Sequence, residues 1–412
     1  MSNSLPGWLA VGAVLVCLAI GGPRLTSTAH AATPVTSVLC GIDVLQRDGF
    51  KLLAGKRVGL ITNHTGINRY GERTVKLLME APAVKLVALF SPEHGIAGKL
   101  DVARIADAKD PDTGLRIYSL YGTTRRPTPE SLKRIDVLVF DIQDIGTRFY
   151  TYISTMGYAM EEAAKHHVDF VVLDRPNPIN GVDVDGPVLD AGRESFVGYH
   201  PIAVRHGMTV GELAAMFRAE RSLDVNLTVV KMKGWHRKDY FDRTGLLWVN
   251  PSPNMRSLTE ALLYPGIGLL EMTNLSVGRG TDRPFELIGA PWLDGQRLAA
   301  RLNAQALPGI RFVPLRFTPN SSKYAGVLCG GISLIITDRT HFRAIDTGLE
   351  IARQLRLLYP KQWDFKPYDR LLGCKKTWQA VGQGLPLPEI RATFRDKLEE
   401  FKRRRKRYLC YD

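Results

Sequence analysis

The first half of the chain alternates short, continuously apolar runs with stretches of helical spacing. RVGLITN (57–63), KLVALF (85–90), IDVLVFDI (135–142) and VDFVVLD (168–174) lack the polar alternation of a strand with one solvent-facing side. Helical spacing separates them, as in TYISTMGYAMEEAAKHH (151–167). Strands buried on both faces and joined by helices are typical of parallel sheets. The pattern therefore predicts an α/β fold with a Rossmann-like, doubly wound parallel sheet.

The length and one Pro-rich stretch predict two domains. A chain of 412 residues exceeds what one hydrophobic core usually holds. VNPSPNMRS (249–257) is rich in Pro, Asn and Ser and is interpreted as a linker or rigid loop. Strand-like IRFVPLRF (310–317) and GISLIIT (331–337) follow, between helical segments. We therefore predict a Rossmann-like domain over 38–256 and a smaller α+β domain over 257–412.

The N-terminus carries the pattern of an export signal. WLAVGAVLVCLAIGG (8–22) is uncharged and short for a membrane span, and an A-x-A pattern follows at 29–31. This predicts a signal peptide over 1–31 and a periplasmic or extracellular location. An uncleaved anchor is the alternative, because no Lys or Arg precedes the apolar run. In such a compartment Cys374 and Cys410 could pair, with free buried thiols as the other interpretation.

The charge of the chain is positive but not concentrated as in a nucleic-acid-binding protein. The net charge is +14, with one dense run at 402–407, KRRRKR. That run suits an anionic cell wall or membrane surface, or simply a solvated helix end. A hydrophobic content of 45% and a charged content of 23% exclude a disordered or membrane-embedded chain. We predict no nucleic-acid partner, and the sequence does not indicate an oligomeric state.

Polar and ionisable residues follow each of the apolar runs. Ligands of open α/β sheets bind beyond the carboxyl ends of the strands, so we expect these residues to converge on one site. Capping of the following helices is the alternative for any one of them. The residues are Asn63 and His64, then Glu93 and His94, then Asp141, Asp144, Arg148 and Tyr150, and finally Asp174, Arg175 and Asn177.

Several reaction classes lack their motifs in this sequence. There is no G-x-G-x-x-G after a strand, no G-x-S-x-G and no H-E-x-x-H. A dinucleotide enzyme and a serine hydrolase of the α/β type are therefore not predicted, and we expect no cofactor. His64, His94 and His206 with nearby carboxylates are the residue types of a zinc site, but their spacing does not support one. A metal-dependent amide or ester hydrolase stays an alternative, and we assign no metal ligands.

The remaining constellation combines carboxylates with arginines and amides. Paired carboxylates serve glycoside hydrolysis, in which one protonates the leaving oxygen and the other attacks or activates water. Arginines bind substrate carboxylates through two parallel hydrogen bonds. The candidates from later in the chain are Arg205, His206, Asn274, Arg279, Asp282, Glu286 and Tyr324.

Six motifs give the chain a family resemblance. They are, in this order, FSPEHG, FDIQDIGTRFYTYI, LDRPNPINGVDVDGP, RHGMTVGELA, NPSPNM and TNLSVGRGTDRPFE. Together they resemble the NamZ-type exo-β-N-acetylmuramidase family, formerly a family of unknown function, from about Arg57 to the C-terminal region. The resemblance implies an exo-acting glycosidase that releases terminal N-acetylmuramic acid from peptidoglycan fragments. It also implies a site between a Rossmann-like domain and a smaller C-terminal domain.

The resemblance also implies roles for single residues. Glu93 of PEHG matches the principal catalytic carboxylate and is expected to act as general acid, with His94 orienting it or binding the sugar. The second catalytic group is Asp144, Asp282 or Glu286, or else the 2-acetamido group of the substrate itself.

Substrate contacts are expected from arginine and tyrosine side chains. Arg175, Arg205 and Arg279 are the candidates for the lactyl carboxylate of muramic acid, and Tyr150 and Tyr324 for stacking on the sugar. Ion pairs and core positions are the structural alternatives. A non-catalytic wall-glycan binding protein is the remaining functional alternative.

Overall fold

The computed structural model describes residues 1–4, 7 and 38–412. The predicted signal peptide therefore lies almost entirely outside the described residues. The main sheet has seven strands in the order β3-β4-β2-β1-β5-β6-β9. Their bounds are Arg57–Thr62 (β1), Lys85–Ser91 (β2), Ala108–Lys109 (β3), Arg116–Ser119 (β4), Val137–Asp141 (β5), Asp169–Leu173 (β6) and Leu227–Val230 (β9).

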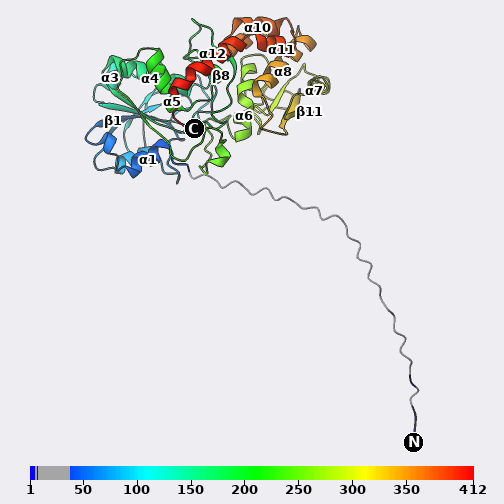
Figure 1. The fold of residues 1–412 in the computed structure, drawn as a ribbon, viewed down its shortest axis with the longest axis horizontal. Helices are drawn as coiled ribbons and strands as arrows, with labels where there is room; N and C mark the ends of the chain where they lie inside the picture. The colour runs from blue at the N-terminus through cyan, green and yellow to red at the C-terminus, as the bar shows by residue number, and fades with distance from the viewer. Residues whose placement is uncertain (5–6, 8–37) are drawn as a thin grey trace. The chain divides into compact units, whose positions relative to one another are not determined.

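The strand pairing confirms the predicted doubly wound sheet. All neighbouring strands run parallel except the short edge strand β3, which is antiparallel to β4. The strand order reverses between β1 and β5, which is the type of position where such sheets bind ligands. The helices of this half lie around the sheet (Figure 1) and are Gly41–Arg47 (α1), Thr74–Glu80 (α2), Pro129–Leu132 (α3), Tyr152–Lys165 (α4) and Val210–Glu220 (α5).

Helix α2 begins at Thr74, directly after a segment that is not helical. The Asn68 side-chain oxygen accepts hydrogen bonds from the backbone N–H groups of Tyr70 (3.0 Å) and Glu72 (2.9 Å). Asn side chains compete in this way with helical hydrogen bonds. The segment before Thr74 is therefore held as a turn.

The C-terminal half is α+β, as predicted. Its antiparallel sheet has the order β10-β12-β11. A separate hairpin of β7 (Asp185–Val188) and β8 (Ala203–Arg205) precedes it. The remaining elements are β10 Leu287–Ala290, β11 Ile310–Phe317, β12 Cys329–Ile336, α6 Leu258–Ile267, α7 Gly295–Asn303, α8 Ala344–Leu358, α9 Asp369–Leu372, α10 Lys375–Gly382, α11 Leu387–Ala392 and α12 Arg395–Arg405. Short 3-10 turns lie at Lys51–Leu53, Phe241–Arg243, Gly268–Leu270, Lys366–Tyr368 and Lys406–Tyr408.

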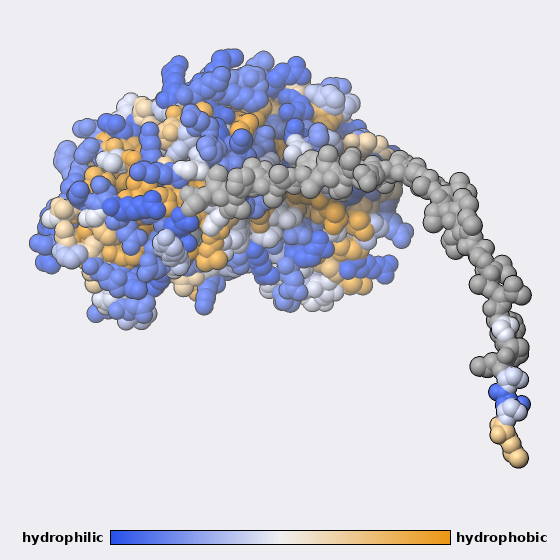
Figure 2. Space-filling model, turned by 60° about the horizontal axis from the view of Figure 1, so that its bottom comes forward, coloured by the Kyte–Doolittle hydropathy of each residue, from blue (hydrophilic) through white to orange (hydrophobic). Residues whose placement is uncertain are grey.

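One hydrophobic core runs through both halves. The same buried cluster includes Phe140 of β5 and Ile332 of β12. A second cluster packs on β1 and α2. Hydrophilic residues dominate the outline of the face shown in Figure 2, with hydrophobic residues between them. Within the described ranges, no helix combines the length and the apolarity that a membrane crossing requires.

The last residues of the chain do not stay with the C-terminal half. Helix α12, red in Figure 1, leads back toward the main sheet. The Tyr411 hydroxyl donates to Asp174 (2.6 Å), and the backbone N–H of Arg237 donates to the carbonyl of Asp412 (2.7 Å). The chain end is therefore packed on the half that the sequence assigns to the first domain.

The basic run at 402–407 is partly structural. Arg405 is buried and donates to the carbonyls of Gly181 (3.1 Å) and Gly207 (2.6 Å). Arg404 pairs with Glu220 at 3.2 Å. Arg403, Lys406 and Arg407 remain exposed, so contact of the run with an anionic surface stays a prediction for these three alone.

The predicted disulfide does not form. Cys40, Cys329, Cys374 and Cys410 are all free thiols. Cys374 is buried, and its sulfur accepts a hydrogen bond from the Thr377 hydroxyl at 3.2 Å. The interpretation as free, largely buried thiols is the one the structure supports.

Candidate active site

Glu93 lies immediately after β2, where two hollows of the surface meet. The first, here called the inner cavity, has a volume of about 140 Å³, and the second, the outer groove, about 780 Å³. Both hollows are lined by Glu93, Thr151, Val197 and Met272. The inner cavity is also lined by His94, Asp101, Phe149, Tyr150, Tyr152, Ser252, Asn254, Met255, Tyr264, Glu271, Arg279, Phe285 and Leu371.

Hydroxyl groups hold the Glu93 carboxylate. The Thr151 hydroxyl, just before α4, donates to Glu93 Oε2. Tyr121 also hydrogen-bonds to Glu93, and burial together with the Glu93 charge raises the pKa of Tyr121 to about 12. No Lys, Arg or His among the described residues forms an ion pair with Glu93. The carboxylate is therefore positioned by hydroxyl groups and not by a cation.

The loop after Glu93 is bent sharply by residues with positive φ. His94 has φ 69°, and its Nδ1 lies 2.7 Å from the Leu100 carbonyl. Because a carbonyl only accepts, Nδ1–H donates, and Nε2 of the neutral ring is left as an acceptor. A side chain at Gly98 (φ 64°) would meet the His64 ring at 1.8 Å, so the loop rests directly on His64. His64 Nε2 in turn lies 2.6 Å from the Asn250 carbonyl.

Two other carboxylates of the inner cavity are paired with one arginine. Arg279 lies 2.6 Å from Asp101 Oδ2 and also pairs with Glu271. Burial alone would raise the pKa of Asp101, but the hydrogen bond and charge of Arg279 outweigh it and lower that pKa. Arg279 thereby favours the ionised form of Asp101 and forms an ion pair with Glu271. Of the three carboxylates that line this cavity, Glu93 is the one without an ion-pair partner among the described residues.

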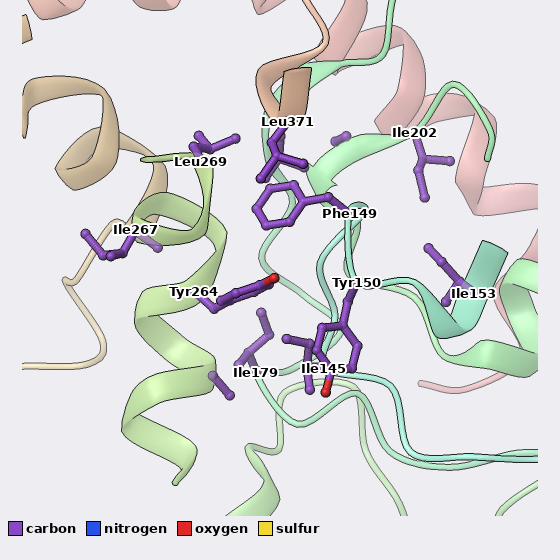
Figure 3. Packing of buried hydrophobic residues seen from close by; sticks show 14 of the residues in the cluster. Ile145, Phe149, Tyr150, Ile153, Ile179, Ile202, Tyr264, Ile267, Leu269 and Leu371 are labelled. Atoms are coloured by element: carbon purple, nitrogen blue, oxygen red, sulfur yellow. The ribbon is translucent and has the colours of Figure 1, made fainter. Parts of the chain in front are cut away.

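An aromatic wall closes one side of the inner cavity. The Tyr264 ring from α6 faces Phe149 (centroids 5.2 Å apart) and Tyr150 (5.9 Å), and Leu371 packs beside Phe149 (Figure 3). Residues from both halves of the chain therefore build this wall. Aromatic faces of this kind suit the apolar face of a sugar ring.

Of the residues predicted from sequence, four line the inner cavity: Glu93, His94, Tyr150 and Arg279. Others form a buried ion pair at the same sheet edge. Arg175 Nε lies 2.6 Å from Asp141 Oδ1, and both side chains are nearly inaccessible. Arg175 also donates to the Ile67 carbonyl (2.8 Å). Asp141 and Arg175 therefore hold loops together instead of facing the cavity.

Arg148 is a structural residue as well. Its guanidinium donates to the carbonyls of Pro187, Ile202, Leu371 and Leu372 at 2.7–3.2 Å. Complete burial lowers its pKa to about 10. Arg148 lines neither the inner cavity nor the outer groove, and its two terminal nitrogens are engaged by backbone carbonyls, so this geometry does not favour the predicted role in substrate binding.

The amides Asn63 and Asn177 also serve the backbone of their loops. Asn63 Oδ1 accepts from Thr65 N–H (2.9 Å), and Asn177 donates to the Met208 carbonyl (3.0 Å). Neither residue lines the inner cavity or the outer groove. His64 does not line either hollow, and its ring supports the loop that follows Glu93.

Asp144 and His206 form a buried pair away from the lining. His206 Nε2 lies 3.5 Å from Asp144 Oδ2, which accepts from Gly146 N–H (2.7 Å). Asp174 accepts from Thr209 (2.7 Å), and Arg205 pairs with Asp183 at 3.1 Å. None of these residues lines either hollow. The charge of Asp144 nevertheless acts on the inner cavity, because burial and then the charges of Glu93 and Asp144 raise the pKa values of Tyr152 and Tyr264.

The candidate site residues between positions 274 and 324 also make their contacts outside the inner cavity. Asn274 donates to the Gln362 carbonyl (2.8 Å), and the Tyr324 hydroxyl donates to the Asn274 carbonyl (2.6 Å). Glu286 pairs with Arg283 at 3.0 Å, and Asp282 is exposed. None of them lines the inner cavity.

The residues missed by sequence reasoning come from loops of both halves. Ser252, Asn254 and Met255 line the inner cavity, although NPSPNM was interpreted as a linker. Glu271 lies just before the TNLSVGRGTDRPFE motif and Asp101 just after the PEHG loop. Closeness to those motifs was the available signal, since neither residue follows an apolar run.

The three histidines of the metal alternative do not converge. His206 is fully buried and lines neither hollow, while His64 lies beneath the loop that carries His94. Across the described ranges, no group of three or more His, Cys, Asp or Glu side chains has an arrangement suited to a metal ion. This geometry does not favour the metal-dependent alternative.

Known relatives share this architecture over almost the whole chain. One is the peptidoglycan beta-N-acetylmuramidase NamZ of Bacillus subtilis (strain 168), 46% identical over 398 residues, covering 94% of this chain and 96% of that protein. Two crystal structures of DUF1343 family proteins from Bacteroides fragilis NCTC 9343 are also similar. One has a TM-score of 0.86 and 41% identity over 92% of this chain and all of that chain. The other has a TM-score of 0.76 and 32% identity, over 92% of this chain and 99% of that chain.

Both halves of the chain match a described family. Residues 58–259 match the N-terminal part of the exo-beta-N-acetylmuramidase NamZ family, and residues 262–411 match its C-terminal part. The chain therefore belongs to the exo-beta-N-acetylmuramidase NamZ family.

Proposed function

We propose that this chain is an exo-acting glycosidase that releases terminal N-acetylmuramic acid from peptidoglycan fragments, with Glu93 as its acid and base. The observation that carries the proposal is the position of Glu93 at the junction of the inner cavity and the outer groove. Membership of the NamZ family and the name of the Bacillus subtilis relative support the substrate class.

The two hollows suit the two sides of a scissile glycosidic bond. A single terminal sugar would lie in the small inner cavity against Tyr150 and Tyr264, with the rest of the fragment in the wider groove. The bond between them then passes Glu93. A protonated Glu93 can donate to the leaving oxygen, and the resulting carboxylate can activate water in the second step.

The paired carboxylates of the cavity suit a different role. Arg279 pairs with both Asp101 and Glu271, and its hydrogen bond and charge lower the pKa of Asp101, which makes Asp101 a poor proton donor. Fixed negative charge stabilises the positive charge that develops on the sugar in glycoside hydrolysis. We therefore assign Asp101 and Glu271 an electrostatic role beside Glu93, while Asp144, Asp282 and Glu286 stay predictions for the second catalytic group. The acetamido group of the substrate stays the alternative nucleophile.

The test is incubation with a defined disaccharide, N-acetylmuramyl-β-1,4-N-acetylglucosamine, followed by mass spectrometry. We expect free N-acetylmuramic acid and N-acetylglucosamine in equal amounts. The isomer with muramic acid at the reducing end is the matched control and stays intact. Saturable binding without products would contradict the proposal and support a wall-glycan binding protein. Loss of turnover after chelation would support the metal-dependent alternative.

The proposal also places the mature chain outside the cytoplasm. The apolar run at 8–22 and the A-x-A pattern at 29–31 support export. N-terminal sequencing of the protein from periplasm or medium should give Ala32 as the first residue. An intact Met1 on protein confined to the cytoplasm would contradict this part of the proposal.

A further inference from the structure

The arginines expected to bind the lactyl carboxylate of muramic acid are already engaged. Arg175 pairs with Asp141 and Arg205 with Asp183. Arg279 does reach the inner cavity, but it pairs with both Asp101 and Glu271. Another group must therefore recognise the carboxylate that distinguishes muramic acid from glucosamine.

The inner cavity is itself unsuited to a substrate carboxylate. Its lining includes three carboxylates, Glu93, Asp101 and Glu271, against the single guanidinium of Arg279. A further negative charge buried there would be repelled at short range in a medium of low dielectric constant. The lactyl group of a sugar bound in this cavity should therefore point outward, into the outer groove.

The outer groove carries Arg125 close to Glu93. The Arg125 guanidinium carbon lies 4.2 Å from the centroid of the Phe196 ring and 5.5 Å from that of Tyr121. Tyr121 is the residue whose hydroxyl hydrogen-bonds to Glu93. Arg125 is thus separated from the proposed acid by one side chain.

Arg125 has no carboxylate partner in the described structure. Within residues 38–412, no Asp or Glu oxygen lies within the 4.0 Å ion-pair distance of its guanidinium, whereas the neighbouring groove residue Arg193 is paired with Asp369 at 2.7 Å. A guanidinium stacked on aromatic rings keeps its N–H edge directed outward and loses little entropy when it binds. The N–H groups on that edge can donate two parallel hydrogen bonds to the oxygens of a carboxylate.

We propose that Arg125, held on the Tyr121–Phe196 platform, binds the lactyl carboxylate of N-acetylmuramic acid and so selects muramic acid over glucosamine. This inference rests on the proposed function. It assigns a specificity role to a residue outside the inner cavity, and it makes the outer groove part of the recognition of the terminal sugar.

The test compares two substrates that differ in this charge and in one methyl group. They are para-nitrophenyl β-N-acetylmuramide and its lactyl methyl ester. For the wild type, kcat/KM on the acid should exceed that on the ester, and Arg125→Met should lower the acid value roughly 10- to 100-fold, the usual range for one charge-assisted contact. The value for the ester should not change. Equal losses on both substrates, or no loss on either, would overturn the assignment.

Two arginine variants serve as controls. Arg116 also stacks on a tyrosine, with its guanidinium carbon 4.8 Å from the Tyr118 ring centroid, but it lines neither the inner cavity nor the outer groove. Arg116→Met should therefore leave both kinetic values unchanged. Arg370 lies in the outer groove. The assignment would be overturned if Arg370→Met, and not Arg125→Met, lowered kcat/KM on the acid alone. That result would assign the lactyl carboxylate to Arg370.

Calorimetry with free N-acetylmuramic acid separates this inference from the proposed function. Binding that weakens about 10-fold or more in Arg125→Met supports the assignment even if the wild type shows no turnover. Wild-type hydrolysis of the muramide, with equal binding of the sugar by wild type and Arg125→Met, would overturn the assignment and leave the proposed function intact.

Discussion

Two acidic residues that each follow a strand of the main sheet differ in their exposure. Glu93 after β2 faces two hollows, whereas Asp174 after β6 is completely buried. Asp174 accepts hydrogen bonds from Thr209 (2.7 Å), Tyr411 (2.6 Å) and the N–H of Gly211 (2.8 Å). Burial still outweighs these donors and raises the pKa of Asp174 to about 6. The residue thus anchors the chain end at an electrostatic cost.

That cost gives a pH-dependent prediction. The pKa of Asp174 rises from 3.8 to about 6 on folding, so its protonation favours the folded state at low pH, and this contribution is lost as pH rises from about 4 to 6. Relative to Asp174→Asn, the wild type should lose about 2 kcal/mol of unfolding free energy between pH 4 and pH 7. Urea titrations of both proteins at the two pH values measure this difference. A difference that does not depend on pH would contradict the assigned burial.

At the scale of elements, the sequence predicted strands well and loop paths poorly. Continuous apolar runs predicted β1, β2, β5 and β6, and the rule for strand ends placed Glu93 at the site. The same rule also selected Asp141 and Asp174, because it places residues at a sheet edge without giving the direction of their side chains. The loops with Ser252 and Glu271 have no periodicity, and packing of the two halves alone decides where they lie.

The loop that carries Glu93 offers a test at this scale. Gly98→Ala should lower kcat/KM at least about 10-fold, because the new Cβ would lie 1.8 Å from His64 and displace the bend behind Glu93. Gly114→Ala is the matched control, since Gly114 has a similar φ of 70° but open space around it. It should cost only about 1–2 kcal/mol of stability from backbone strain. Equal kcat/KM values in the two variants would contradict the claim that His64 supports this loop.

At the scale of the molecule, the two halves are coupled by the core and by the chain end. The aromatic wall of the inner cavity combines Phe149 and Tyr150 of the first half with Tyr264 of α6. The C-terminal residues then return to the main sheet, where the Tyr411 hydroxyl also accepts from the N–H of Met232 (3.0 Å). The site geometry is therefore expected to depend on residues far from it in sequence.

Deletion of residues 409–412 tests this coupling. It removes the hydrogen bonds of Tyr411 and Asp412 and leaves the buried Asp174 with one donor fewer, so we expect a loss of about 2–4 kcal/mol of unfolding free energy. Tyr411→Phe isolates the single hydroxyl and should cost less than the deletion. A thermal unfolding temperature unchanged by the deletion would show that the chain end contributes nothing to the fold.

The most direct measurement of the central claim is the turnover of para-nitrophenyl β-N-acetylmuramide by Glu93→Gln. The amide keeps the shape of the side chain and an oxygen that accepts from Thr151, but it cannot donate a proton as an acid does. We expect kcat to fall at least about 100- to 10,000-fold, with an unchanged thermal unfolding curve. Turnover within a few-fold of the wild type would contradict the assignment of Glu93 as the acid and base of this site.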